Sequence, residues 1–321
     1  MATSSHDSPF ATLASRAKAR LDRALRETSM AKFQVTPLTP TIGAVVGGVD
    51  LSQRLDEDQL AEVRAALLAH QVIFFEDQHI TPVQHRDFAA RFGALHTHPL
   101  YPGVPEAPEL FILDNHKDNP TDNDSWHTDV TFIQTPPMAS ILYAKHLPPS
   151  GGDTIWSNMK AAYEALSPTF RAFLSGLDAV HDFARGFPQQ GIVAAGAGAE
   201  KHAKALAENP PVLHPVVRTH PETGEDGLFI NYGFTDRIKG LRRKESDAIL
   251  NMLFEHIQKP EFLVRWRWKD NAIAFWDNRV TQHYAVNDYL PHRRIMNRAT
   301  VLGDRPYHRS RLPTGVQVAA E

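Results

Sequence analysis

Short apolar segments separated by turn residues recur along this chain, and they restrict it to a β-rich fold. Each segment is apolar throughout or alternates apolar with charged residues, and most are bounded by Gly, Pro, Asn or Asp, as strands are. The segments are residues 33–38, 42–46, 71–76, 110–113, 138–144, 262–268, 272–276 and 294–302. The pattern predicts a mainly β core with flanking helices, without distinguishing a sandwich from a jelly roll.

Helical signals lie between these segments. Residues 56–70 have apolar side chains at helical spacing and acidic residues in their first turn. Thr81 is followed by a proline and, three residues after the cap, by Gln84, which is the pattern of a capped helix start. Ser167 and the proline after it repeat this pattern, and residues 244–257 are amphipathic. We expect these helices to pack outside the β core.

The two ends of the chain differ from the region between them. Residues 1–30 carry an Arg-rich amphipathic stretch and are expected to form an N-terminal extension, helical or disordered. A mitochondrial presequence and a natural start at Met30 are alternative interpretations, whereas a secretory signal would need a continuous apolar stretch. We expect a single domain over residues 31–310 and a C-terminal tail over residues 311–321. The Gly- and Ala-rich residues 186–200 predict a mobile loop or lid.

The absence of cysteine restricts the chemistry that the chain can support. Disulfides, thiolate nucleophiles, zinc fingers and iron–sulfur clusters are excluded, so any metal must bind to nitrogen and oxygen. The 17 histidines and 37 carboxylate side chains permit such a site. The net charge of −3 gives no basic field for nucleic acid, and no apolar run is long enough to span a membrane. We therefore expect no nucleic-acid partner, no membrane and a cytoplasmic location, although a cysteine-free chain also fits the periplasm.

Triplets of the form His-x-Asp or His-x-Glu are candidate metal sites, because residues i and i+2 of a strand point to the same side. In a helix they diverge by about 200°. The chain has four such triplets, which begin at His85, His116, His127 and His220. The first lies in an expected helix, and the second and fourth lie in expected loops or turns. Only His127 and Asp129 lead into a β-branched run, residues 130–133, so we expect them to begin a strand and to bind a metal. The alternative is a solvated start of a surface strand.

His283 is a candidate third ligand, because it follows a strand and a turn-rich corner over residues 276–282. Two histidines and one carboxylate on one face form a facial triad, which leaves coordination positions open on Fe(II). A zinc hydrolase is the competing interpretation, although such sites usually need a separate general base.

Arg294 and Arg298 are candidates for binding an anion. If residues 294–298 form a strand, these two side chains share a face. On an inward face they need anionic partners, and a guanidinium can bind a carboxylate or a sulfonate through two hydrogen bonds. The alternative places Arg293 and Asn297 inward instead. Together with the triad, the first arrangement predicts a site for an anionic co-substrate and an anionic substrate.

Three long motifs resemble the taurine dioxygenase branch of the Fe(II)/2-oxoglutarate-dependent dioxygenases. They are residues 123–132, 276–284 and 293–303, and the similarity extends from about Phe33 to about Tyr307. The resemblance implies a double-stranded β-helix, which is a jelly-roll core flanked by helices. It also implies Fe(II) as the metal, with 2-oxoglutarate and O2 as co-substrates.

The same resemblance implies roles for individual residues. Fe(II) would be bound by His127, Asp129 and His283. The distal carboxylate of 2-oxoglutarate would be bound by Thr154 and Arg294. In a taurine pocket, the sulfonate would be bound by His98 and Arg298, the amine would lie near Tyr101 and Asn123, and the walls would be Phe187 and Phe234.

Two residues depart from the pattern of this family. Gly186 stands where a serine is expected beside Phe187, and Tyr232 stands where an acidic residue is expected. Neither change affects iron or 2-oxoglutarate binding, but both concern the end of the pocket that would hold the amine of taurine. A longer or differently substituted sulfonate, or a sulfate ester, is therefore an alternative substrate.

The resemblance implies oxidative cleavage of a C–S bond. Hydroxylation of the carbon that bears sulfur gives an unstable 1-hydroxy sulfonate, which yields sulfite and an aldehyde, while 2-oxoglutarate becomes succinate and CO2. The alternatives are a sister dioxygenase for alkyl sulfate esters or another small organic acid, a catalytically silent jelly-roll binding protein, and a zinc hydrolase. We expect a small anionic sulfonate as the partner and a homo-oligomer, either a dimer or a tetramer.

Overall fold

The computed structural model describes residues 32–97, 102–119, 124–188 and 199–311. The predicted N-terminal extension, residues 312–321 of the predicted tail and most of the predicted loop over residues 186–200 lie outside the described residues. Arg311 is described, and its guanidinium donates hydrogen bonds to the main-chain carbonyls of Ser175 and Leu177. None of the helices in the described ranges is long and apolar enough to cross a membrane.

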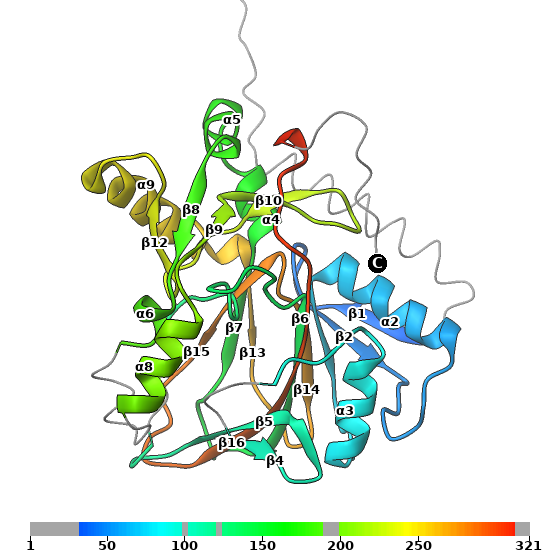
Figure 1. The fold of residues 1–321 in the computed structure, drawn as a ribbon. Coiled ribbons are helices and arrows are strands. Elements are labelled where there is room, and N and C mark those ends of the chain that lie inside the picture. The colour runs from blue at the N-terminus through cyan, green and yellow to red at the C-terminus, as the bar shows by residue number, and fades with distance from the viewer. Residues whose placement is uncertain (1–31, 98–101, 120–123, 189–198, 312–321) are drawn as a thin grey trace, which may run out of the picture.

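An eight-stranded sheet forms the larger layer of the core, and it interleaves strands from both ends of the chain (Figure 1). In order across the sheet, the strands are β1 (Gln34–Pro37), β2 (Ala44–Gly47), β3 (Val72–Phe75), β14 (Ile273–Asp277), β6 (Ala139–His146), β16 (Arg294–Val301), β5 (Ala107–Asn115) and β4 (Gly103–Val104). β2 and β3 are parallel, and the other neighbours are antiparallel. Because early and late strands alternate, the sheet is complete only when both halves of the chain are in place.

A three-stranded sheet packs against this layer and completes the jelly roll. Its strands, in order, are β13 (Leu263–Trp266), β7 (Thr154–Asn158) and β15 (Thr281–Ala285), all antiparallel. Aromatic side chains fill the space between the two sheets, where the ring of Phe74 stacks on Trp266 at 4.1 Å and meets the edge of Trp156 at 5.4 Å. The mainly β fold with a jelly-roll core is therefore confirmed.

Two helices cover the other face of the large sheet. α2 (Glu57–His70) and α3 (Pro82–Ala90) each begin with a capping box, in which Asp56 and Thr81 pair with the glutamine three residues later, and the cap at Thr81 is the one that the sequence predicts. Their buried side chains, among them Val63 and Phe88, join the core that includes Phe75 and Phe275 of the sheet. Figure 1 shows both helices lying beside β1 and β2, on the side away from β7 and β13.

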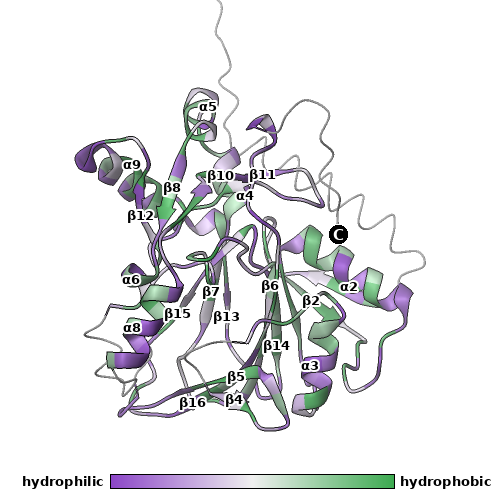
Figure 2. Ribbon diagram, in the orientation of Figure 1, coloured by the Kyte–Doolittle hydropathy of each residue, from purple (hydrophilic) through white to green (hydrophobic). Residues whose placement is uncertain are grey.

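The remaining elements form a smaller layer beyond the β7–β15 end of the core. They are α4 (Met159–Glu164), α5 (Pro168–Ser175), β8 (Asp178–His181), α6 (Phe183–Gly186), α8 (Ala199–Glu208), β9 (Val212–Pro215), β10 (Val217–Thr219), β11 (Asp226–Leu228), β12 (Thr235–Ile238), α9 (Arg243–His256) and the 3-10 turns Pro260–Phe262 and Arg309–Arg311. In Figure 2 the strands of the large sheet are mostly hydrophobic, whereas α8 and α9 carry hydrophilic residues on their outer faces.

Candidate active site

His127 and His283 come from distant parts of the chain and pair directly. Each donates its main-chain N–H to the carbonyl of the other, at 3.0 and 2.8 Å, in an isolated antiparallel bridge. This bridge sets His127 beside His283 of β15 and places both imidazoles on the same side as the Asp129 carboxylate. Metal-binding atoms of the three residues lie within 4.8 Å of one another, and all three residues are buried. Within the described residues this is the one such cluster of three or more His, Asp or Glu side chains.

The segment after His127 is not the strand that the sequence predicts. Residues 129–132 form a turn, and Val130 adopts a φ of 54°, which a β-branched residue rarely occupies. The cause lies outside the segment, because side chains from other segments already bind the main-chain groups that would pair with a neighbouring strand. The N–H and carbonyl of Asp129 bind the side chain of Asn278, and the carbonyl of Thr131 accepts from His214.

The turn between β14 and β15 forms the support on which the His127–Asp129 segment rests. Asn278 accepts a hydrogen bond from the N–H of Asp129 at 2.9 Å and donates to the carbonyls of Asp129 and Pro137, both at 3.1 Å. The hydroxyl of Thr128 donates to the carbonyl of Thr281 at 2.9 Å. The two ligand-bearing segments are therefore joined by side-chain hydrogen bonds as well as by the His127–His283 bridge.

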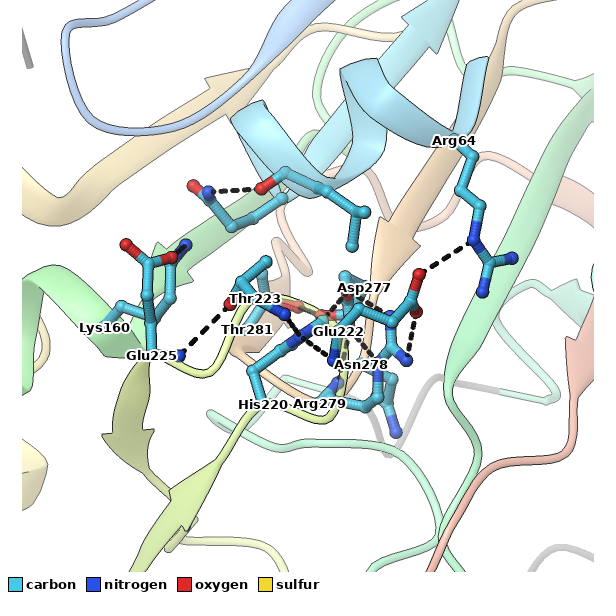
Figure 3. A network of polar contacts seen from close by, with 12 residues as sticks. Arg64, Lys160, His220, Glu222, Thr223, Glu225, Asp277, Asn278, Arg279 and Thr281 are labelled. Carbon is cyan, nitrogen blue, oxygen red and sulfur yellow. Dashed lines mark hydrogen bonds and ion pairs between the residues drawn. The ribbon is translucent and has the colours of Figure 1, made fainter. Parts of the chain in front are cut away.

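A buried network of charged side chains holds this turn in place (Figure 3). Arg279 donates to both oxygens of Asp277, at 2.9 and 2.7 Å, and to Glu222 at 2.7 Å. Glu222 also accepts from Arg64 of α2 at 2.8 Å, and His220 lies 2.9 Å from Asp277. Burial alone would raise the pKa of Asp277, but Arg279 and His220 hold it well below its usual range. The predicted turn triplet at His220 thus belongs to this network, which ties the β14–β15 turn to α2.

The two imidazoles are prepared to act as metal ligands. The Nδ1 of His127 lies 2.7 Å from the carbonyl of Ser125, which can only accept, so Nδ1 carries the proton and Nε2 presents its lone pair. Burial lowers the pKa of His127 to about 4 and that of His283 well below its usual value. Both rings are therefore neutral at neutral pH, as metal binding requires.

The two oxygens of the Asp129 carboxylate have different surroundings. Oδ1 faces the Nε2 atoms of His127 and His283, at 3.7 and 3.6 Å. Oδ2 accepts a hydrogen bond from the hydroxyl of Ser140 at 3.0 Å and forms an ion pair with Arg298. One oxygen is thus directed to the metal position while the other is held by the sheet. Two neutral nitrogens and one carboxylate oxygen make a donor set that fits Fe(II).

A cavity beside the triad ends at a buried arginine. It is lined by Leu113, Asn115, His127, Leu142, Thr154, Trp276, His283, Ala285, Val286, Tyr289, Arg294 and Arg298. The Nε and one Nη of Arg294 are buried without a hydrogen-bond partner among the described residues. Burial lowers the pKa of Arg294 to about 10, so the side chain is still cationic at neutral pH. A buried cation with two such nitrogens suits an anionic ligand in the cavity.

Thr154 and Gly152 complete the end of the cavity where Arg294 lies. The hydroxyl of Thr154 accepts from the indole N–H of Trp268 at 3.0 Å, which leaves its own hydrogen available to an anion. Gly152 has a φ of 69°, and a Cβ there would lie 3.1 Å from Cδ of Arg294. The glycine therefore allows the arginine to pass close to the chain, and the three residues lie together at one end of the cavity.

The structure places some of the predicted substrate residues and not others. His98, Tyr101 and Asn123 lie outside the described residues. Phe187 and Phe234 belong to an aromatic cluster with Phe132 and Phe183, next to the His127 segment.

The structure resolves which arginines point inward. Arg294 and Arg298 are buried, whereas Arg293 is exposed and paired with Asp114. Asn297 is also buried, because β16 lies inside the sheet and is covered on both faces.

Sequence reasoning missed Asn278, Ser140 and Tyr289. Asn278 lies in the segment that supplied the third ligand candidate, and this was its only signal. The only signal for Ser140 was its place as a polar residue inside an apolar strand.

The other triplets behave as expected: His85 is buried in α3 while Asp87 of the same helix points outward, and His116 and Asp118 lie in a turn.

Comparison with known proteins supplies a second line of evidence. The family model described as "Taurine catabolism dioxygenase TauD, TfdA family" matches residues 34–300. The chain is 38% identical over 277 residues to the "Alkylsulfatase" of Acinetobacter baylyi, a match that covers 85% of this chain and 86% of that protein. It is 39% identical over 277 residues to the "Alpha-ketoglutarate-dependent sulfate ester dioxygenase" of Pseudomonas putida, covering 86% and 91%. The crystal structure of a taurine dioxygenase from Burkholderia xenovorans superposes with a TM-score of 0.75 at 39% identity, over 87% of this chain and 94% of that one.

Proposed function

Because the chain belongs to the taurine catabolism dioxygenase TauD, TfdA family, we propose that it hydroxylates an organosulfur anion at the carbon next to the sulfur-containing group. Members of this family are alpha-ketoglutarate-dependent dioxygenases that use Fe(II), 2-oxoglutarate and O2. The observation that carries the proposal is the buried His127–Asp129–His283 triad, whose two histidines line one cavity together with two buried arginines.

In this proposal different residues of the site bind Fe(II), 2-oxoglutarate and the substrate. His127, Asp129 and His283 hold Fe(II), which with 2-oxoglutarate supplies the activation of O2 when bound. Arg294 and Thr154 bind the distal carboxylate of 2-oxoglutarate, because the guanidinium is otherwise unpaired and the threonine hydroxyl has a free hydrogen. Arg298 binds the anionic group of the substrate and thereby fixes which carbon faces the metal.

Arg298 also contacts the metal ligand, which links substrate binding to the triad. Its guanidinium pairs with Oδ2 of Asp129 and donates to the hydroxyl of Ser140 at 2.8 Å. A substrate anion bound by the same guanidinium is therefore held within reach of the carboxylate that ligates the metal. The surrounding aromatic side chains of Trp276 and Phe111, 5.2 and 5.4 Å from the guanidinium, keep water away from this charge.

The reaction is balanced for either class of organosulfur substrate. With a sulfonate, one oxygen atom of O2 enters the C–H bond next to sulfur, and the 1-hydroxy sulfonate breaks its C–S bond to give an aldehyde and sulfite. With an alkyl sulfate, the same hydroxylation next to the ester oxygen gives an aldehyde and sulfate. In both cases the other oxygen atom oxidises 2-oxoglutarate to succinate and CO2.

Sulfonates such as taurine are the substrates that the sequence predicts, and alkyl sulfate esters are the second candidate. Two observations favour the esters. The relatives at 38% and 39% identity are described as an alkylsulfatase and a sulfate ester dioxygenase. In addition, Gly186 and Tyr232 differ from the residues expected at the amine end of a taurine pocket.

The test is a substrate panel assayed with the full-length protein. The protein is loaded anaerobically with Fe(II) and 2-oxoglutarate, mixed with taurine, an alkanesulfonate or an alkyl sulfate, and then exposed to O2. We expect O2 uptake and succinate in equal amounts with an aldehyde, and sulfite or sulfate according to the substrate class. His127→Ala and Asp129→Ala should abolish turnover, while His116→Ala, in the exposed triplet, should leave it unchanged.

Three results would contradict the proposal. Full turnover by Asp129→Ala would show that the reaction does not require the triad. Sulfate release without O2 would indicate a hydrolase, and a complete absence of 2-oxoglutarate turnover would indicate a binding protein.

A further inference from the structure

The connection between β15 and β16 forms one wall of the cavity beside the triad. The residues that it contributes to the lining are Ala285, Val286 and Tyr289. The ring of Tyr289 and the stem of Arg294 both pack against Gly152, since a Cβ on this glycine would lie 3.3 Å from Cδ1 of the tyrosine and 3.1 Å from Cδ of the arginine. The connection therefore covers the end of the cavity where the buried guanidinium lies.

Asp288 attaches this connection to the residues before β7. Its Oδ1 accepts a hydrogen bond from the main-chain N–H of Gly152 at 2.8 Å. The N–H of Val286 donates to the carbonyl of Asp153 at 2.9 Å. Arg265 of β13 lies between the two carboxylates, with Nε 2.7 Å from Oδ2 of Asp153 and Nη2 4.0 Å from Oδ2 of Asp288. The connection is thus held at two points along the wall that it forms.

Gly151 leaves the space that Asp288 needs for this contact. It has a φ of 78°, which glycine adopts without strain, and a Cβ here would lie 2.5 Å from Oδ1 and 3.1 Å from the main-chain oxygen of Asp288. Both distances are shorter than van der Waals contact, so a side chain at position 151 would displace the carboxylate. The hydrogen bond to Gly152 therefore depends on the glycine that precedes it.

The anchor and the wall are adjacent residues in different environments. The side chain of Asp288 is 48% exposed, whereas Tyr289 is 4% exposed and faces the cavity. A restraint on Asp288 therefore limits the movement of the Tyr289 ring. A ring held at the Arg294 end excludes water from it, and the attraction between the guanidinium and a bound anion is stronger where water is excluded.

We propose that Asp288 is a positioning residue for 2-oxoglutarate: by binding the N–H of Gly152, it holds Tyr289 at the Arg294 end of the cavity and keeps water out of that end. This inference rests on the proposed function, in which Arg294 and Thr154 bind the distal carboxylate, and it adds a residue that lies outside the lining of the cavity. Without the hydrogen bond the connection can move outward, and the guanidinium then binds the carboxylate less tightly.

The experiment measures binding of 2-oxoglutarate without turnover. The full-length protein is loaded with Mn(II) under exclusion of O2 and titrated with 2-oxoglutarate in a calorimeter. Asp288→Ala should raise the Kd for 2-oxoglutarate by about threefold to tenfold, the effect of losing one hydrogen bond. Asp288→Asn should keep most of the affinity, because its amide oxygen can accept the same hydrogen bond. The Kd for Mn(II) alone should stay unchanged in both variants, since Asp288 is not part of the triad.

Gly151→Ala tests the same contact from the other side. Its methyl group displaces the Asp288 carboxylate, so the Kd for 2-oxoglutarate should rise at least as much as in Asp288→Ala. Gly240→Ala is the matched control, because Gly240 has a φ of 84° and a Cβ there would meet nothing within 4 Å. Both substitutions strain a left-handed backbone, but only the first changes the connection. If Gly151→Ala does not fold, the Asp288 variants provide the test.

A double variant tests whether Asp288 acts through Tyr289. Tyr289→Ala removes the wall itself and should raise the Kd for 2-oxoglutarate at least as much as Asp288→Ala. Adding Asp288→Ala to Tyr289→Ala should cause little further change, because the ring that Asp288 holds in place is already absent.

The outcomes distinguish this inference from the proposed function. If the wild type binds 2-oxoglutarate and Asp288→Ala binds it equally well, or if Asp288→Asn is as weak as Asp288→Ala, the inference alone is overturned. Independent effects of Asp288→Ala and Tyr289→Ala in the double variant also overturn it. If the wild type binds no 2-oxoglutarate, the proposed function fails and the inference fails with it.

Discussion

Arg293 and Arg294 are adjacent in the sequence, yet their guanidinium groups lie in opposite environments. Arg293 is 54% exposed and pairs with Asp114, whereas Arg294 is 5% exposed and has two nitrogens without a partner among the described residues. Arg294 begins β16 and points into the cavity beside the triad. Substitution of Arg294 therefore tests the role of the buried guanidinium, and the same substitution of Arg293 is the control.

Arg294→Gln should raise the KM for 2-oxoglutarate by about tenfold to a hundredfold. The physical reason is the loss of a charge-assisted hydrogen bond, which contributes about 1.5–3 kcal/mol. Initial rates at varied 2-oxoglutarate check this, and Arg293→Gln should have no effect. An equal effect of the two changes would show that the loss of charge, rather than its position in the cavity, is responsible.

Arg298→Gln should raise the KM for the organosulfur substrate while leaving that for 2-oxoglutarate nearly unchanged. The guanidinium lies on the triad side of the cavity, next to Oδ2 of Asp129. Ser140→Ala is the companion variant, because it removes a hydrogen bond to the same Oδ2 but keeps the cation. A rise in the KM for the organosulfur substrate in Ser140→Ala as large as in Arg298→Gln would contradict direct binding of the anion by Arg298.

Asn278→Ala should weaken binding of a divalent metal by about tenfold to a hundredfold, the usual effect of removing a residue that orients a ligand. Asn278 holds both main-chain polar groups of Asp129, so its loss frees the turn that carries the carboxylate. Calorimetric titration with Mn(II) or Co(II) checks this without any turnover. Asn209→Ala is the control, because it removes one side-chain-to-carbonyl hydrogen bond at the end of α8. Unchanged metal affinity in Asn278→Ala would mean that the His127–His283 bridge positions Asp129 by itself.

The stability of the metal-free protein should fall as the pH drops from about 6.5 to 4, and His85 should account for part of this fall. Burial lowers the pKa of His85 to about 4, while the unfolded chain titrates near 6.5. Below about 6.5 the unfolded state binds a proton that the folded state does not, so the free energy of unfolding decreases toward acid.

The slope from one such histidine approaches about 1.4 kcal/mol per pH unit. His85→Gln, whose amide can keep the hydrogen bond to the carbonyl of Ile141, should lose about 2 kcal/mol less than the wild type between about pH 7 and pH 5. Urea unfolding with a chelator present measures this difference, and His79→Gln, which changes an exposed histidine, is the control. Parallel pH profiles for the wild type and His85→Gln would disprove the assignment.

Local signals predicted the elements of this fold well, because caps and periodicity act within a few residues. The capping box at Thr81, the helix over residues 57–70 and the strands that became β3, β6, β14 and β16 are where the sequence indicated. The jelly roll itself followed from the family resemblance, since periodicity does not specify how strands pair.

The conformation around the ligands depended on contacts that no local pattern contains. The predicted strand after His127 is wrong because Asn278, 149 residues further along, occupies the N–H and carbonyl of Asp129. The choice between Arg293 and Arg294 as the inward residue was likewise open, since both fit an alternating strand. Only the pairing of β16 with β5 and β6 decides which side chain faces the cavity.

The interleaving of early and late strands sets the order in which the metal site can be assembled. A ribosome delivers His127 and Asp129 long before Asn278 and His283, and until then Asp129 has neither its hydrogen-bond partner nor the third ligand. A chain that ends before β14 lacks one ligand and the central strand between β3 and β6. The nascent protein therefore presents no complete triad until β15 has been synthesised.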